Sequence, residues 1–346
     1  MANAMCLSSF PLSKTLKLYP KSTLTPLAIL TSSGYKMRVP YQLKDGQNRQ
    51  FHELKSGLKM EVISQKKEKR NGEEQEEKND KPPLVFIHGS FHGAWCWAEH
   101  WLPFFAHYGF DCYALSLLAQ GESDTPTDKV AGTLQTHAAD IAHFIGKELT
   151  SPAVLVGHSF GGLIVQYYLS SIKNKEMIDN SHPRPDLAGA VLVCSVPPSG
   201  NSGLVLRYLF SKPIAAFKVT RSLAAKAFQT DLSLCKETFF SPQLADSLVQ
   251  RYQKLMTESS RLPLFDLRKL NASLPVPSIP ESSVRVLVVG AKDDFIVDAK
   301  GLDETGEFYG VTPVCVDGVA HDMMLDCEWE KGANAILSWL TTLETE

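Results

Sequence analysis

Gly157-His158-Ser159-Phe160-Gly161 is the stretch that decides the fold of this chain. It follows an apolar run at residues 153–156 and opens a helical pattern that begins with Leu163 and Ile164. A Gly-x-Ser-x-Gly sequence in this position is typical of a tight strand-to-helix turn. Its glycines are required because side chains there would collide with neighbouring elements, and the turn points the serine hydroxyl outward. The pattern predicts Ser159 as a nucleophile.

Short apolar runs on both sides of this turn predict the strands of a sheet. They cover residues 84–87, 112–115, 153–156, 188–194, 284–289 and 313–316. Continuous apolar runs of this length are typical of parallel strands that are covered on both faces. Residues 52–63 are expected to form an opening strand or hairpin.

Helical patterns alternate with these runs. Leu134, Ala138, Ile141 and Ile145 recur at spacings of four, three and four, and a last helix is expected over Trp329–Leu343. The alternation predicts an α/β protein with a doubly wound, mostly parallel sheet.

Almost 90 residues separate the predicted strands at 188–194 and 284–289, which is too long for a plain crossover. We expect residues 199–280 to form a helical cap over the carboxyl edge of the sheet. Within it, residues 242–257 predict a helix with Leu244, Leu248 and Tyr252 on one face.

A serine hydroxyl is a weak nucleophile until a base removes its proton. His321 follows the last predicted strand, so it is the expected base. The acid that orients it is expected after the strand at 284–289, where Asp293 and Asp294 stand together. Asp294 is favoured because its spacing to Ile296-Val297 matches the usual D-x-I-V turn, and Asp293 is the alternative.

The strand at 188–194 is followed by Cys194-Ser195-Val196 and no acid, which excludes the other position for this group. The chain order Ser159, Asp294, His321 is the order of α/β-hydrolases and differs from that of other serine hydrolases.

Two backbone amides are expected to bind the negative oxygen of a tetrahedral intermediate. One is the amide of Phe160, directly after the nucleophile. The other should come from the loop after the first buried strand, His88-Gly89-Ser90-Phe91-His92-Gly93, where Ser90 is our choice. No Walker lysine, G-x-G-x-x-G or zinc-spaced His/Cys cluster occurs, so neither a cofactor nor a metal is expected.

The first 44 residues contain six basic residues, no acid and many Ser and Thr. Residues 1–45 therefore predict a chloroplast transit peptide, with an unstructured tail as the alternative, and residues 46–346 are predicted to form the catalytic domain.

A charged run at 66–81 predicts a solvated loop. The net charge of −3 without a basic stripe argues against nucleic acid, and seven scattered cysteines predict reduced thiols rather than a disulfide frame. No run approaches the length of a membrane span.

Together these residues resemble the α/β-hydrolase superfamily over about residues 83–343. The stretch HGSFHGAWCW at 88–97 is similar to the HGxxHGAWxW loop of plant methyl esterases and hydroxynitrile lyases. GESD at 121–124 also matches, although the usual preceding Asp is replaced around Ser116. The lyases carry Lys directly after the catalytic His, and Asp322 stands there instead, which argues against cyanohydrin cleavage.

The long amino-terminal extension and the apolar cap more closely resemble plastid hydrolases of plants that act on chlorophyll, prenyl or acyl lipid esters. This resemblance implies a plastid serine esterase acting on a lipid or prenyl ester, with release of phytol for tocopherol synthesis as a specific role. Peripheral contact with a plastid membrane fits that substrate. Leu204, Leu206, Leu209, Phe210 and Phe217 would either bind an apolar tail or pack the cap against the core. The alternatives are a small-molecule methyl esterase, an acyltransferase, and a ligand receptor with the hydrolase fold.

Overall fold

The structure is a computed structural model that describes residues 37, 38, 40–68, 81–172, 185–211, 213–278 and 284–343. Most of the predicted transit peptide and most of the predicted charged loop at 66–81 lie outside these residues.

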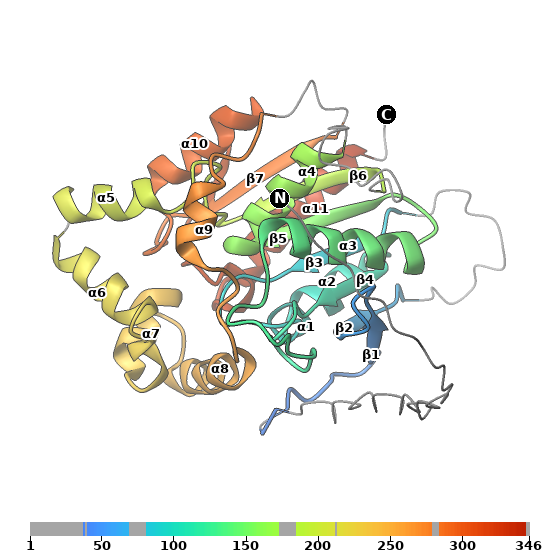
Figure 1. Ribbon diagram of the computed structural model, residues 1–346, viewed down its shortest axis with the longest axis horizontal. Helices are drawn as coiled ribbons and strands as arrows, with labels where there is room; N and C mark the ends of the chain where they lie inside the picture. The colour runs from blue at the N-terminus through green and yellow to red at the C-terminus, as the bar shows by residue number, and fades with distance from the viewer. Residues whose placement is uncertain are drawn as a thin grey trace, which may run out of the picture. The chain divides into compact units, whose positions relative to one another are not determined.

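An eight-stranded sheet runs through the protein in the order β1-β2-β4-β3-β5-β6-β7-β8 (Figure 1). Its strands are β1 Gln47–Glu53, β2 Lys59–Gln65, β3 Leu84–Ile87, β4 Cys112–Leu115, β5 Ala153–His158, β6 Leu187–Val193, β7 Val286–Ala291 and β8 Val314–Val316. β1 and β2 form an antiparallel hairpin, β2 pairs antiparallel with β4, and every pairing from β4 to β8 is parallel. The predicted mostly parallel sheet is confirmed, and the expected opening element is a hairpin.

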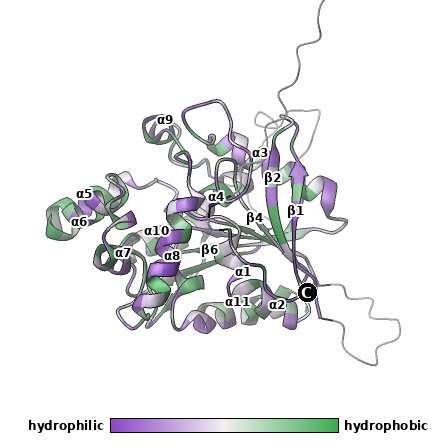
Figure 2. Cartoon of the chain, turned by 90° about the horizontal axis from the view of Figure 1, so that it is seen from below, coloured by the Kyte–Doolittle hydropathy of each residue, from purple (hydrophilic) through white to green (hydrophobic). Residues whose placement is uncertain are grey.

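Helices cover both faces of the sheet (Figures 1 and 2). One face packs against α1 Trp95–Ala98, α2 Trp101–His107 and α11 Trp329–Leu343. The other packs against α3 Leu134–Glu148, α4 Phe160–Ser171 and α10 Ala299–Tyr309. Strands β3 to β7 are almost fully buried, which explains their continuous apolar runs. The run at 313–316 is different, because Val314 and Cys315 of the edge strand β8 are exposed.

The described chain between β6 and β7 forms α5 Ser202–Ser211, α6 Pro213–Leu223, the 3-10 turn η1 Ala227–Gln229, α7 Leu232–Phe239, α8 Asp246–Ser259 and α9 Leu267–Ala272. A second 3-10 turn, η2 Met323–Leu325, precedes α11. The insertion is thus helical, and 199–280 stays a predicted boundary.

The expected face of the helix at 242–257 is partly wrong. α8 begins after Leu244, and Leu248 is exposed. The buried face carries Val249, Tyr252 and Met256, because the helix is turned so that its apolar stripe meets α1 and α7.

The apolar residues at the start of the cap are exposed. Leu209, Phe210 and Phe217 are 53%, 83% and 70% exposed, respectively. The alternative that these three pack the cap against the core is therefore wrong. The side chains of Leu204 and Leu206 lie outside the description.

A buried carboxylate fixes the loops at the carboxyl edge of β4. Glu61 on β2 accepts hydrogen bonds from the Ser116 hydroxyl at 2.6 Å and the Glu122 amide at 2.9 Å. Arg49 pairs with its other oxygen at 2.7 Å, and the Ser116 hydroxyl accepts the Ala94 amide at 2.8 Å. Glu61 thus brings a carboxylate to Ser116, the region where the usual Asp of the resembled family is replaced.

We expect Glu61→Ala to lower the free energy of unfolding by about 2–4 kcal/mol, because it leaves buried donors and a cation without their acceptor. Glu53→Ala, an exposed glutamate of the same hairpin, is the matched control and should change stability by less than about 0.5 kcal/mol. Urea unfolding measures both. Equal losses in the two variants would contradict the role assigned to Glu61.

Candidate active site

Ser159 occupies a strained turn between β5 and α4. Its backbone has φ 54° and ψ −121°, a conformation that costs a non-glycine residue about 1–3 kcal/mol. The turn is held from both sides, since the Ser159 amide donates to the Val193 carbonyl at 3.1 Å and the Ser159 carbonyl accepts the Val196 amide at 3.2 Å. The end of β6 and the segment that follows it therefore fix the position of this serine.

Glycine is required on both sides of Ser159 by close approach. A Cβ atom on Gly161 would lie 2.3 Å from the carbonyl oxygen of Ile87, and one on Gly157 would lie 2.6 Å from that of Gly161. Gly89 lies against the serine itself, since its Cβ would stand 2.8 Å from the Ser159 Cβ. The steric reason inferred from the sequence is confirmed, and Gly89 brings the loop after β3 to the nucleophile turn.

His321 and Asp294 are in direct contact. His321 Nδ1 lies 2.9 Å and 3.0 Å from the two carboxylate oxygens of Asp294. Asp294 Oδ1 also accepts the amides of Ile296 at 2.7 Å and Val297 at 2.9 Å, which is the turn expected from the D-x-I-V spacing. Asp293 is exposed, so Asp294 is the carboxylate that faces the imidazole.

The electrostatics of this pair favour the charged imidazole. Burial alone would lower the pKa of His321, but the charge and hydrogen bond of Asp294, with the charge of Asp322, raise it above the ordinary histidine value.

Burial and the Asp294 carboxylate, which accepts a hydrogen bond from the thiol, raise the pKa of Cys194 well above its usual range. Cys194 stays a protonated donor to the acid, a contact that the sequence did not reveal.

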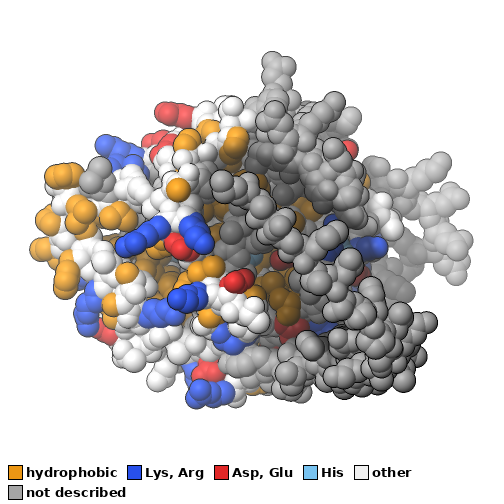
Figure 3. Space-filling view, in the orientation of Figure 1, with side chains coloured by type: hydrophobic (Ala, Val, Ile, Leu, Met, Phe, Trp, Pro, Cys, Tyr) orange, Lys and Arg blue, Asp and Glu red, His pale blue; other side chains and the backbone are white. Residues whose placement is uncertain are grey.

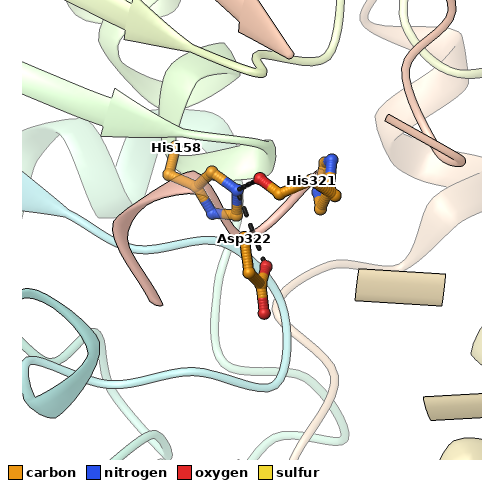
Figure 4. A group of neighbouring side chains, drawn as sticks. All are labelled: His158, His321 and Asp322. Atoms are coloured by element: carbon orange, nitrogen blue, oxygen red, sulfur yellow. Dashed lines mark hydrogen bonds and ion pairs between the residues drawn. The ribbon is translucent and has the colours of Figure 1, made fainter. Parts of the chain in front are cut away.

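His158 connects the serine turn to the loop of His321. Its Nε2 donates to the His321 carbonyl at 2.9 Å, and the two rings lie 4.7 Å apart (Figure 4). In the described chain the Ser159 hydroxyl makes no hydrogen bond to His321. The structure joins His321 to Asp294 and brings Ser159 to the same edge of the sheet through His158.

The amides proposed to bind the oxyanion lie on either side of this turn. Among the described residues, neither the Ser90 nor the Phe160 amide donates a hydrogen bond, so both are available to a ligand. The loop of Ser90 is also strained, because Phe91 has φ 68°. The Phe91 ring packs 4.9 Å from that of Phe228 in the cap, which supports this conformation.

His88 and His92, on the loop after β3, are buried beside the site. His88 accepts the Leu117 amide at 3.0 Å, and its Nδ1 lies 2.7 Å from the Gly89 carbonyl. Burial lowers its pKa to about 3, so it is neutral. His92 contacts Asp322 at 2.9 Å, a pair that the sequence analysis did not anticipate because 230 positions separate the two.

Two groups of side chains place metal-ligating atoms within 4.8 Å of one another: His158, His321 and Asp322, and Cys194, Asp294 and His321. Their hydrogen bonds account for both groups, since His158 donates to a backbone carbonyl and His321 to Asp294.

A hollow of about 330 Å³ lies beside the loop of Asp294. It is lined by Pro213, Ile214, Ala215, Lys218, Glu237 and Phe295. Phe295, which directly follows Asp294 in the sequence, is the residue of that loop that lines the hollow.

The sequence profile of the alpha/beta hydrolase family matches residues 84–333, which is well over half of the chain. The chain belongs to the alpha/beta hydrolase family. The match contains Ser159, Asp294 and His321 in one domain, as the fold requires.

Sequence similarity to curated relatives of this hydrolase is local. Methylesterase 1 of Arabidopsis thaliana is 37% identical over 92 residues, which cover 25% of this chain and 33% of the relative. Chloroplastic methylesterase 13 of the same plant is 30% identical over 93 residues, covering 27% of this chain and 20% of the relative. The matches thus span a third or less of these relatives.

Solved structures resemble the hydrolase over most of its length. An esterase from Exiguobacterium antarcticum has a TM-score of 0.64 at 19% identity and covers 84% of this chain and 98% of its own. An epoxide hydrolase from Vigna radiata has a TM-score of 0.59 at 18% identity, with 87% and 100% covered. At these identities the likeness establishes the fold.

Within the described residues, no helix of the hydrolase is both long and apolar enough to cross a membrane.

We expect the activity of this hydrolase to rise with pH through a pKa above the ordinary histidine value of about 6.5, because a base acts only when neutral and the pKa of His321 is raised. Asp294→Asn should move this inflection to lower pH and reduce kcat about 10⁴-fold. The measurement is kcat/KM for a p-nitrophenyl ester between about pH 5 and about pH 9. An unshifted inflection in Asp294→Asn would show that Asp294 does not raise the pKa of the base.

Proposed function

We propose that this protein is a serine hydrolase that cleaves carboxylic esters through an acyl-enzyme. Ser159 attacks the ester carbonyl while His321 removes its proton, and Asp294 holds the imidazole and stabilises its charged form. The amides of Ser90 and Phe160 bind the oxygen that becomes negative.

The intermediate collapses when His321 returns the proton to the leaving alcohol, which breaks the ester bond and leaves the acyl group on Ser159. Water then attacks this acyl group, His321 again takes the proton, and the acid is released as the Ser159 hydroxyl re-forms.

One observation carries the proposal: the His321–Asp294 hydrogen bond lies at the same sheet edge as a serine held in a strained turn. Backbone strain of this kind concentrates at functional sites, because a surrounding structure must be built to maintain it.

We expect Ser159→Ala to abolish ester hydrolysis and labelling by a fluorophosphonate probe, because the nucleophilic oxygen is removed. His321→Ala should lose nearly as much activity, since the hydroxyl then lacks its base. Ser195→Ala, which alters a buried serine beside the turn, is the control and should keep its labelling. Undiminished labelling of Ser159→Ala would show that another serine is the nucleophile.

For the substrate, we propose a lipid or prenyl ester of the chlorophyll and phytyl type in the chloroplast, with phytol released for tocopherol synthesis. The support is the apolar character of α5 and α6, where Phe210, Ile214 and Phe217 are at least 70% exposed. Apolar side chains gather at the left of Figure 3, where α5 and α6 lie, and Ile214 lines the hollow that Phe295 also lines (Figure 3). This exposed apolar surface would also contact a plastid membrane peripherally.

The chloroplast location rests on the acid-free first 44 residues and on relatives whose names place them in that organelle. A small methyl ester is the second candidate substrate, and the names of the methylesterase relatives favour it.

We expect kcat/KM for p-nitrophenyl esters to increase with acyl chain length, because apolar tails gain contact with α5 and α6. The variant Phe210→Ser/Phe217→Ser should lose this gain for long chains and keep the hydrolysis of acetate. Leu248→Ser, which alters an exposed leucine on α8, is the control. A preference for the shortest esters would instead favour the small methyl ester.

A further inference from the structure

A second buried histidine–carboxylate pair lies behind the proposed catalytic one. His92 comes from the loop after β3, and Asp322 directly follows His321. Their side chains are 1% and 0% exposed, and His92 Nε2 lies 2.9 Å from Asp322 Oδ2. The esterase mechanism described above does not use either residue.

Both ring nitrogens of His92 lie within hydrogen-bond distance of an oxygen. Its Nδ1 lies 2.8 Å from the Ser90 carbonyl, and its Nε2 faces Asp322. Burial would raise the pKa of Asp322, but His92, with His158 and His321, outweighs burial and lowers it. The carboxylate form of Asp322 is therefore favoured.

The pair links the two loops that the proposed reaction uses. On one side His92 donates to the carbonyl of Ser90, whose amide is a proposed oxyanion donor and whose neighbour Phe91 is strained. On the other side Asp322 is joined by a peptide bond to His321. A displacement of either partner would change the distance between the oxyanion donors and the base.

The carboxylate also acts on the base through its charge. Asp322 Oδ1 is buried, has no hydrogen-bond partner in the described chain, and lies 3.8 Å from His158 Nε2 (Figure 4). The groups that face Asp322 are His92, His158, His321 and the thiols of Cys96 and Cys235. Those that face His321 are Asp294, Asp322, His158 and Cys194. Asp322 is thus the second carboxylate that favours the protonated form of His321.

We propose that the buried His92–Asp322 contact positions the Ser90 loop against His321 and that Asp322 places a second negative charge beside that base. Both residues are positioning residues, because neither touches the reacting atoms. The inference rests on the proposed serine-hydrolase function and adds a structural requirement to it.

The test compares Asp322→Asn with Asp326→Asn. Asp322→Asn should move the acid limb of kcat/KM to lower pH, and should lower kcat about tenfold to a hundredfold with a smaller change in KM, less than the loss of an oxyanion donor itself. Asp326 is a buried carboxylate of the same loop that binds Ser241 and the Ala320 amide. Its variant should lose stability without shifting the acid limb.

A double-mutant cycle covers the case in which Asp322→Asn does not fold. His92→Gln keeps a donor for the Ser90 carbonyl and removes the imidazole, and His92→Gln/Asp322→Asn replaces both partners with amides. The double variant should fold and be no slower than the worse single variant, because the two residues act as a unit. Additive losses, or a folded Asp322→Asn enzyme with an unmoved acid limb and kcat within about threefold of the parent, would overturn the proposal.

A readout without substrate separates this inference from the proposed function. NMR titration of the His321 imidazole in isotope-labelled protein should give a lower pKa in Asp322→Asn than in the parent chain. Absence of ester hydrolysis and of fluorophosphonate labelling in the parent would defeat the proposed function alone. An unchanged His321 titration would defeat the positioning role alone.

Discussion

The backbone of Ser159, held at φ 54° between a buried strand and a buried helix, is the constraint on which the site depends. The conformation is maintained because the end of β6 and the segment after it bind the turn through two backbone hydrogen bonds, and because glycines allow α4, the end of β3 and the following loop to approach it. Each of these contacts comes from a different part of the chain. The parallel sheet is what brings them to one edge, so the fold and the site are specified by the same residues.

The sequence predicts this arrangement where the signal is local. Leu84–Ile87 and Cys112–Leu115 are strands with the predicted bounds, and the last helix begins at Trp329 as expected, because continuous burial and helical spacing are written in neighbouring residues. Asp294 could be preferred to Asp293 for the same reason, since its carboxylate caps amides only two and three residues later. Local hydrogen bonds leave a local pattern.

Contacts between distant segments left no such pattern. Leu248 was placed on the wrong face because the rotation of α8 is set by α1 and α7, which the helix meets only in the folded chain. His92 and Asp322 have no shared local pattern, because 230 positions separate the two partners. The contact between the Cys194 thiol and Asp294 leaves no local pattern for the same physical reason: the partners follow adjacent strands, β6 and β7, that are far apart in sequence.

The cap is bonded to the loop of His321 rather than merely resting above it. Asp326 binds both the amide and the hydroxyl of Ser241, the Asp322 amide donates to the Phe239 carbonyl, and Phe228 supports Phe91. A chimera that grafts the helical insertion of a related enzyme onto this sheet therefore has to carry the matching 320–327 segment with it, because these hydrogen bonds cross from one to the other.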